Sequence, residues 1–166
     1  MQEFVEELPA GPVLDVGCGS GRDGMFARTL GRDVIFADAA FEMLRHVPRD
    51  MAVCCDVLSL PFRDELFAGV IVSGVLLHVP RESCPATLAE LLRITAEGGQ
   101  VSLSMKSGPG EGWRRTGEVP GLRWFTYYTE EEFAALCAEA GFAVLRAWKS
   151  PREDWFTVVV TRSHDE

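Results

Sequence analysis

The stretch VLDVGCGSGRDG, residues 13–24, has glycine at four of its twelve positions, directly after a short apolar run. Glycine lets the backbone turn sharply and lets a ligand touch the main chain. A plain strand-to-helix turn needs about one glycine, so the alternation of Gly17, Gly19 and Gly21 predicts a ligand-binding loop. The spacing differs from the G-x-G-x-x-G pattern of dinucleotide sites. Asp15 adds a carboxylate, which suits a ligand with a cationic group better than a diphosphate.

Three further side chains that could take part in chemistry lie near or beyond the ends of predicted strands. Asp38 ends VIFAD and lies 21 residues after Gly17, which fits an acidic residue that binds ribose hydroxyls. Asp56 follows the apolar run MAVCC. His78 follows the fourth strand, and a histidine there either acts as a base or makes a structural hydrogen bond. Of Tyr127 and Tyr128, we expect one to face the site and the other to pack in the core.

The elements predicted to position these residues alternate between strands and helices along the chain. Apolar runs predict strands over 12–16, 33–38, 51–57, the start of 67–79, 100–106, 142–150 and 154–162. Helical spacing predicts helices over 2–8, 23–30, 41–47, 82–99 and 129–142, the last opened by a Thr129–Glu132 capping box. This order indicates an α/β fold, a Rossmann-like three-layer sandwich with a seven-stranded, mostly parallel sheet. The last two strands form an antiparallel hairpin at one edge. The length suits a single domain over residues 1–166.

With these motifs in place, the sequence resembles class I S-adenosylmethionine (SAM)-dependent methyltransferases of the small bacterial, stand-alone type. VLDVGCGSGRD is similar to the glycine-rich first motif of that family. FAGVIVSGVLLHVPR resembles its fourth-strand motif, although Ala68 stands where an aspartate is usual. RWFTYYTEEEFAALCAEAGF resembles the segment that enters the last helix. The resemblance covers nearly the whole chain after residue 12.

The resemblance implies a role for each matching residue. Asp38 would bind both ribose hydroxyls, Asp56 would accept the adenine amino group, and Val57 would lie beside the adenine ring. Phe41, Met43 and Leu44 fall in the stretch that flanks the adenine. The full set of expected cofactor-binding residues is Asp15, Gly17, Cys18, Gly19, Gly21, Asp38, Ala39, Met43, Asp56, Val57 and Ser73. The catalytic candidates are His78 and Tyr127, and no metal site is expected.

The implied reaction is transfer of the methyl group of SAM to an O, N or C atom of a small molecule, which leaves S-adenosylhomocysteine (SAH). Such an in-line displacement depends on aligning the reacting atoms at ~3–3.5 Å. A base is needed only for a hydroxyl or ammonium acceptor. Two alternatives stay open: a protein that binds SAM or SAH without catalysis, and a methyltransferase acting on RNA or protein.

The charge composition of the chain limits which partners the protein is expected to bind. The net charge of −9 disfavours binding to nucleic acid. The Gly/Pro-rich loop 107–121 carries Glu111, Trp113 and Arg114. A basic cluster of Arg114, Arg115, Lys106 and Arg123 either holds one anionic group or is simply solvated. Trp113 either closes over a substrate or fills a surface groove.

The N-terminal segment predicts an incomplete cover for the site. Twelve residues precede the first strand, room for one short helix, whereas family members usually carry two. We expect an open pocket for a bulky substrate, a homodimer partner that completes the wall, or binding without catalysis. No apolar run reaches the ~20 residues needed to span a bilayer, and MQEFVEELP does not resemble a signal peptide. The expected location is therefore the cytoplasm.

Overall fold

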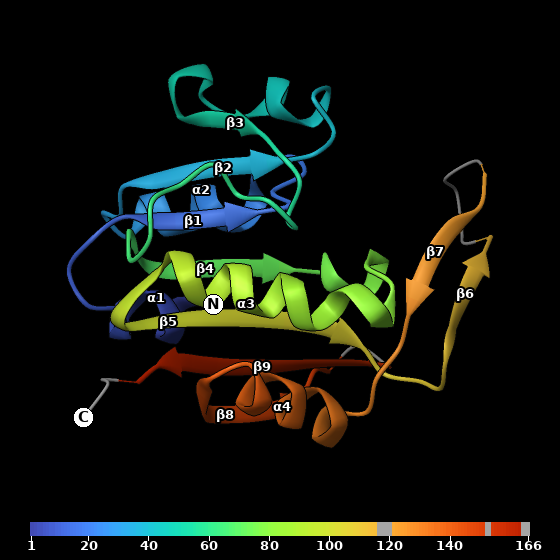
Figure 1. The fold of residues 1–166 in the computed structure, drawn as a ribbon. Coiled ribbons are helices and arrows are strands. Elements are labelled where there is room, and N and C mark those ends of the chain that lie inside the picture. The colour runs from blue at the N-terminus through green and yellow to red at the C-terminus, as the bar shows by residue number, and fades with distance from the viewer. Residues whose placement is uncertain (116–120, 152–153, 164–166) are drawn as a thin grey trace.

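The computed structural model describes residues 1–115, 121–151 and 154–163. Its main sheet has seven strands in the order β3-β2-β1-β4-β5-β9-β8 (Figure 1). The pairs from β3 to β5 are parallel, whereas β9 runs antiparallel to both β5 and β8. The predicted mostly parallel sheet with an antiparallel C-terminal hairpin is confirmed. The strands are β1 (Val13–Val16), β2 (Val34–Asp38), β3 (Ala52–Cys54), β4 (Phe67–Ser73), β5 (Thr95–Lys106), β8 (Phe142–Lys149) and β9 (Trp155–Arg162).

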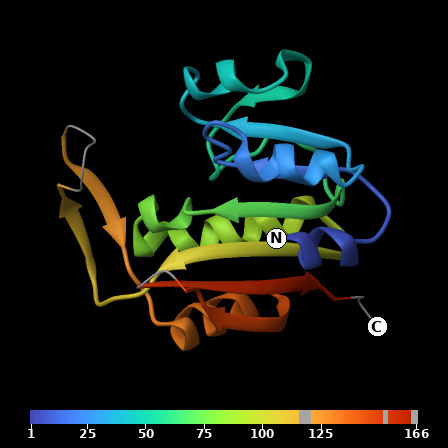
Figure 2. The ribbon, with the colours of Figure 1, turned by 180° about the vertical axis from the view of Figure 1, so that it is seen from behind.

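Helices cover both faces of this sheet and complete the predicted three layers. α1 (Gln2–Glu7) and α2 (Arg22–Thr29) lie on one face, and α3 (Cys84–Ile94) and α4 (Glu130–Glu139) lie on the other (Figures 1 and 2). Alternation along β1 divides its residues between two cores. Leu14 and Val16 join the larger core with α3, and Val13 joins the core with α2. No helix within the described residues is long and apolar enough to cross a membrane.

Three predicted segments differ most from the observed elements. The segment 41–47 forms only a 3-10 turn, Met43–His46, because Phe41 and Met43 are exposed and contribute little packing to support a helix. The predicted strand 51–57 shortens to β3. The predicted helix 82–99 ends at Ile94, and β5 already begins at Thr95. Its glycine pair lies inside β5: a Cβ on Gly99 would come within 3.0 Å of the Phe67 carbonyl oxygen, where the register of β4 and β5 shifts.

The predicted loop 107–121 contains a strand that sequence reasoning missed. β6 (Glu111–Arg114) pairs antiparallel with β7 (Arg123–Thr126), and this hairpin stands apart from the main sheet, beyond the ends of its parallel strands (Figures 1 and 2). Residues 116–120 of the predicted loop lie outside the described residues. The glycine and proline content suggested an irregular loop. The pairing depends on the partner strand, which the loop's own sequence does not reveal.

The short N-terminal helix, expected as part of a cover, packs elsewhere. Phe4 and Val5 of α1 are buried in the core on the α2 face. The Arg32 guanidinium donates hydrogen bonds to the carbonyl oxygens of Val5, Leu8 and Pro9. Figure 2 shows α1 near the end of the sheet where the parallel strands begin, opposite to the end where they finish. The helix therefore stabilises the sheet rather than the edge where a ligand site is expected.

Candidate functional site

The glycine loop, residues 17–21, joins β1 to α2 at the carboxyl edge of the sheet. A Cβ on Gly17 (φ 62°) would lie 2.3 Å from Val75 Cγ2, and one on Gly21 (φ 82°) would lie 2.4 Å from Val47 Cγ1. Gly19 (φ 53°) has open space on its Cβ side. Glycine at the first and last positions thus permits both the turn and close packing. At the middle position it leaves the main chain accessible to a ligand.

Asp38, the last residue of β2, holds this loop against the neighbouring strand. Its Oδ2 accepts a hydrogen bond from the Gly19 backbone N–H at 2.8 Å, and its Oδ1 accepts one from the Ala40 N–H at 2.8 Å. A carboxylate offers about four lone pairs, so both oxygens can accept further bonds. Asp38 therefore orders the loop and still presents acceptors for two hydroxyl groups.

A pocket of about 280 Å³ opens where β1, β2 and β4 end. It brings together six of the predicted residues: Gly17, Asp38, Ala39, Asp56, Val57 and His78. This location follows the general rule for parallel α/β sheets, whose ligands bind beyond the carboxyl ends of the strands. The remaining lining residues, which the prediction did not include, are Val16, Ala37, Cys55, Gly74 and Val75.

The side chains of two other predicted residues, Asp15 on β1 and Cys18 in the glycine loop, are buried on the α2 side of the sheet. Asp15 is 2% exposed and its Oδ2 accepts a hydrogen bond from the Gly24 backbone N–H at 2.9 Å. Burial raises the pKa of Asp15 to about 7. Cys18 belongs to the core on the α2 face, and burial raises the pKa of its thiol to about 12, so the thiol stays protonated. Both side chains support the loop from the α2 side of the sheet.

Met43 and Ser73, two further predicted cofactor-binding residues, are not among the residues that line the pocket. Met43 is 44% exposed on the turn after β2. Ser73 ends β4, makes a hydrogen bond with Asp23, and lines a second hollow of about 180 Å³. Gly74 lines both the pocket and this second hollow, so the two adjoin. The second hollow also contains Arg22, Ser104, Ser150, Trp155, Phe156 and Thr157.

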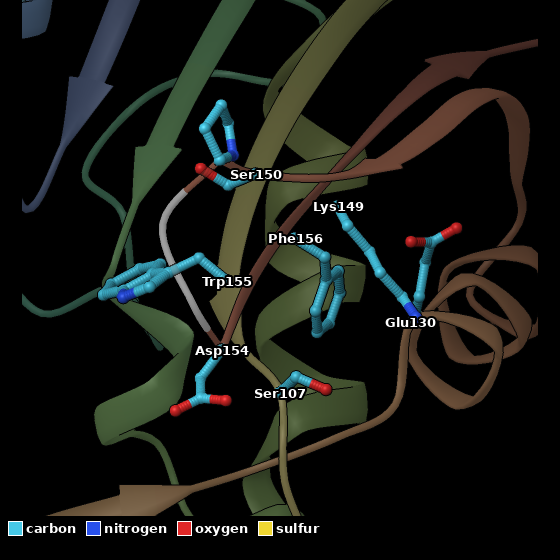
Figure 3. Close-up of a pocket in the computed structure, with 8 residues that line it drawn as sticks. Ser107, Glu130, Lys149, Ser150, Asp154, Trp155 and Phe156 are labelled. Carbon is cyan, nitrogen blue, oxygen red and sulfur yellow. The ribbon is translucent and has the colours of Figure 1, made fainter.

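A third hollow, of about 320 Å³, lies beside the turn between β8 and β9. In Figure 3, Lys149 extends toward Glu130, whereas Trp155 points to the opposite side. The Trp155 ring approaches within 3.3 Å of the position that a Cβ on Gly74 would take. Trp155 lines the second and third hollows, so the three form a row along the carboxyl edge. Sequence reasoning missed Trp155 because its approach to β4 depends on the strand order.

His78 sits at the wall of the pocket with a defined hydrogen bond. Its Nδ1 lies 2.8 Å from the Trp124 carbonyl oxygen. A carbonyl oxygen only accepts, so Nδ1 carries the proton and Nε2 carries the lone pair of the neutral ring. Burial, aided by the charge of Arg123, lowers the pKa of His78, although the hydrogen bond to Trp124 raises it. The imidazole is therefore neutral near pH 7 and can accept a proton.

The two tyrosines pack among neighbouring side chains. The Tyr127 ring stacks on Phe125 with centroids 6.0 Å apart, and the Tyr127 carbonyl oxygen accepts a hydrogen bond from Arg81. Tyr128 is 2% exposed and packs on Phe133. Tyr127, the predicted catalytic tyrosine, is thus separated from His78 by the Phe125 ring, whose centroid lies 4.8 Å from that of His78.

Comparison with known proteins matches residues 13–99, just over half of the chain, to a family model described as a methyltransferase domain. The chain belongs to this methyltransferase family. The matched region contains the glycine loop, Asp38, Asp56 and His78, so the family match and the pocket coincide.

Individual relatives of this methyltransferase domain are diverse. It is 34% identical over 120 residues to a demethylmenaquinone methyltransferase from Renibacterium salmoninarum, covering 69% of this chain and 49% of that protein. It is 33% identical over 106 residues to a probable tRNA methyltransferase 9B from Mus musculus, covering 61% of this chain and 23% of that protein. The chain thus spans about half, or less, of the length of these curated relatives.

Among solved structures, the fold is similar to that of 1,6-didemethyltoxoflavin-N1-methyltransferase from Burkholderia thailandensis. That crystal structure contains 1,6-didemethyltoxoflavin and S-adenosylhomocysteine. The TM-score is 0.78 at 20% identity, with 98% of this chain and 78% of that chain covered. At this identity the likeness shows that the two chains share a fold.

Proposed function

We propose that this chain is a SAM-dependent methyltransferase that acts on a small molecule. The observation that carries the proposal is the pocket at the carboxyl ends of β1, β2 and β4, where an open glycine backbone meets Asp38 and Asp56. When bound, SAM supplies a methyl group activated by its sulfonium. The chain's own residues have to hold the cofactor, align the acceptor and exclude water.

The residues of the pocket fit an adenosyl ligand. Asp38 has free lone pairs on both oxygens for a ribose diol, in addition to its bonds to Gly19 and Ala40. Asp56 and Val57 lie in the same lining and offer a carboxylate and an apolar side chain for a purine. The open space at Gly19 leaves room for a ligand against the main chain. The adjoining hollow at Ser73 and Arg22 offers polar groups to an amino-acid moiety.

His78 is suited to assist an acceptor that must lose a proton. Its neutral ring presents Nε2 as an acceptor at the wall of the pocket, while Nδ1 is fixed to the Trp124 carbonyl oxygen. With this orientation Nε2 can take a proton from a hydroxyl or ammonium acceptor. Tyr127 would contribute indirectly, because it stacks on the Phe125 ring that contacts His78.

Removing the Asp38 carboxylate tests the cofactor assignment. Asp38→Ala is expected to weaken SAH binding by roughly 1–3 kcal/mol, because ribose hydroxyls lose a charged acceptor. Isothermal titration calorimetry measures this directly. The matched control is Asp33→Ala, an exposed carboxylate just before β2, at the opposite end of that strand. Equal SAH affinity of wild type and Asp38→Ala would refute the role of Asp38, and a wild type that does not bind SAH would refute the cofactor.

Transfer of a labelled methyl group separates an enzyme from a binding protein. Wild type with labelled SAM and a metabolite pool should move label into small molecules, and His78→Ala should slow this transfer more than it weakens SAH binding. Label that stays on SAM would favour binding without catalysis.

A specific observation supports a second candidate function, an RNA methyltransferase: the similarity of this sequence to that of tRNA methyltransferase 9B. The net charge of −9 opposes it, and label in added tRNA would support it.

A further inference from the structure

A fourth hollow, of about 500 Å³, lies at β3, the outermost strand of the main sheet (Figure 1). Its volume falls within the range of about 300–1,000 Å³ that is typical of small-molecule sites in proteins. Among the described residues, it shares no lining residue with the pocket proposed for the cofactor, so the two are separate sites. The lining residues of the hollow are Phe41, Leu44, Arg45, Arg49, Ala52 and Cys54.

One part of this lining is apolar and only partly covered by protein. Leu44 is buried in the core on the α2 face, whereas the Phe41 ring is 63% exposed. No large apolar side chain among the described residues is more exposed than Phe41. Ala52 and Cys54 occupy alternate positions of β3, so their side chains lie on the same side of the strand. An apolar surface of this kind, at a hollow rather than on a flat face, is typical of a ligand groove.

The other part of the lining is cationic, because Arg45 and Arg49 supply two guanidinium groups and no described lining residue is acidic. Arg45 Nη1 lies 2.9 Å from Glu42 Oε2, so Glu42 already balances this charge. The Arg49 guanidinium has no hydrogen bond or ion pair with the residues that the structure describes. A guanidinium binds a carboxylate with two parallel hydrogen bonds. Arg49 is therefore the group with which an anionic part of a ligand would pair.

β3 connects this hollow to the pocket proposed for the cofactor. The Cys54 thiol donates a weak hydrogen bond to the Ala39 carbonyl oxygen, at 3.7 Å. Ala39 lines the cofactor pocket, as do Cys55 and Asp56, the two residues that follow Cys54. A ligand held between Phe41 and β3 would therefore contact both segments of the chain that continue into the cofactor pocket.

We propose that the hollow at β3 is a second ligand site, which binds an apolar molecule with one carboxylate group. The apolar body covers Phe41 and Leu44, and the carboxylate pairs with Arg49. Occupancy of this site tightens cofactor binding, because the ligand favours the arrangement of β3 and Ala39 that the cofactor also contacts. The site itself is independent of methyl transfer, and only its coupling to the cofactor rests on the proposed function.

The binding test titrates 2-naphthoate into the SAH-bound protein and follows the backbone amides by NMR. Saturable shifts are expected in residues 41–54. The neutral alcohol 2-naphthalenemethanol has the same rings without the charge, so it should bind about tenfold more weakly or worse.

Two matched pairs of variants test the two parts of the lining. Arg49→Gln should weaken naphthoate binding by about fivefold or more, whereas Arg63→Gln, at an exposed arginine outside the lining, should change it by less than about twofold. Phe41→Ala should weaken it by a similar factor, whereas Phe26→Ala, at an exposed phenylalanine on α2, should not.

Calorimetry with SAH measures the coupling between the two sites. Saturating 2-naphthoate should tighten SAH binding to wild type by about twofold or more, and the same concentration should have less effect on Arg49→Gln. An SAH affinity that is unchanged while naphthoate is bound would refute the coupling. If SAH does not bind wild type, the proposed function fails, and a naphthoate titration without SAH still decides the second site.

Four outcomes would overturn the second site. One is the absence of saturable shifts in wild type, and another is a naphthoate that SAH displaces, which would place it in the cofactor pocket. The third is an equal loss of affinity in the control variants, or equal binding of the alcohol. The fourth is a dimer of wild type that Phe41→Ala dissociates, which analytical ultracentrifugation detects and which would show that a second copy of the chain covers the hollow.

Discussion

Two aspartates near the glycine loop have different surroundings and therefore different uses. Asp38 ends β2 and lines the pocket, and the hydrogen bonds it accepts from Gly19 and Ala40 leave further lone pairs on both of its oxygens. Asp15 is enclosed on the α2 face, where it accepts one bond from Gly24 and its pKa rises to about 7 because of burial. At the scale of single residues, exposure at the strand end distinguishes the carboxylate that we propose binds the cofactor from the carboxylate that is buried beneath the loop.

The raised pKa of Asp15 predicts a pH dependence of stability. The folded state holds the Asp15 proton up to about pH 7, whereas the unfolded chain releases it near pH 4. The contribution is therefore fully present below about pH 4 and is lost as the pH rises through about 7, at most roughly 4 kcal/mol. Asp15→Asn keeps an acceptor for Gly24 but does not titrate. Urea unfolding at pH 5 and pH 8 should show Asp15→Asn gaining stability relative to wild type at the higher pH. Parallel pH profiles would contradict the prediction.

Asp38 could be placed at the site because it ends an apolar strand 21 residues after Gly17, and Asp56 could be placed there from the family resemblance; both line the pocket. The sequence did not reveal the position of Asp15, because one isolated strand does not show which of its faces a helix will cover. Likewise, the approach of Trp155 to Gly74 follows from the order β4-β5-β9, which brings distant parts of the chain together. The position of a residue was predictable where it depends on the end of that residue's own strand, and it was not predictable where it depends on a neighbouring strand or helix.

Among the elements, the β6–β7 hairpin is joined to the site by several contacts, which include the Trp124 carbonyl oxygen at His78 Nδ1. Glu111 Oε2 joins the start of β6 to Arg81 and Thr126. The register and the anchoring of the hairpin were hidden from sequence reasoning, which identified only glycines, two prolines, Trp113 and scattered charges in this loop. By contrast, the capping box at Thr129 and Glu132 was predicted and is confirmed, because it is a local pattern within four residues.

Loss of the Glu111 anchor should loosen the hairpin without unfolding the main sheet. Glu111→Ala leaves the Arg81 backbone N–H without this acceptor, at a cost of about 1–3 kcal/mol, whereas the Thr126 hydroxyl keeps the Val79 carbonyl oxygen at 2.7 Å. Amide hydrogen exchange should accelerate in residues 111–114 and 123–126, whereas β1 and β4 keep their protection. Glu139→Ala, an exposed change at the end of α4, is the control. Uniform acceleration across the whole protein would show that Glu111 supports global stability instead.

At the scale of the whole molecule, the site is assembled from elements distant in sequence. The pocket and the two adjoining hollows take their residues from the ends of strands across the sheet, from Asp38 on β2 to Lys149 on β8. α1 packs on the core near the end of the sheet where the parallel strands begin. The carboxyl edge is therefore bordered by loops and the β6–β7 hairpin instead of α1. A ligand at this edge therefore contacts segments that come together only when the sheet is complete.

Such a ligand should stabilise the folded chain as a unit. If SAH binds only the folded state, then SAH at 100 times its dissociation constant should raise the free energy of unfolding by about 2.7 kcal/mol. A tenfold weaker Asp38→Ala variant should gain about half as much at the same SAH concentration. Thermal unfolding monitored by circular dichroism measures both, with Asp33→Ala expected to follow wild type. A stabilisation by SAH that is equal in Asp38→Ala and wild type would show that the ligand binds away from the carboxyl end of β2.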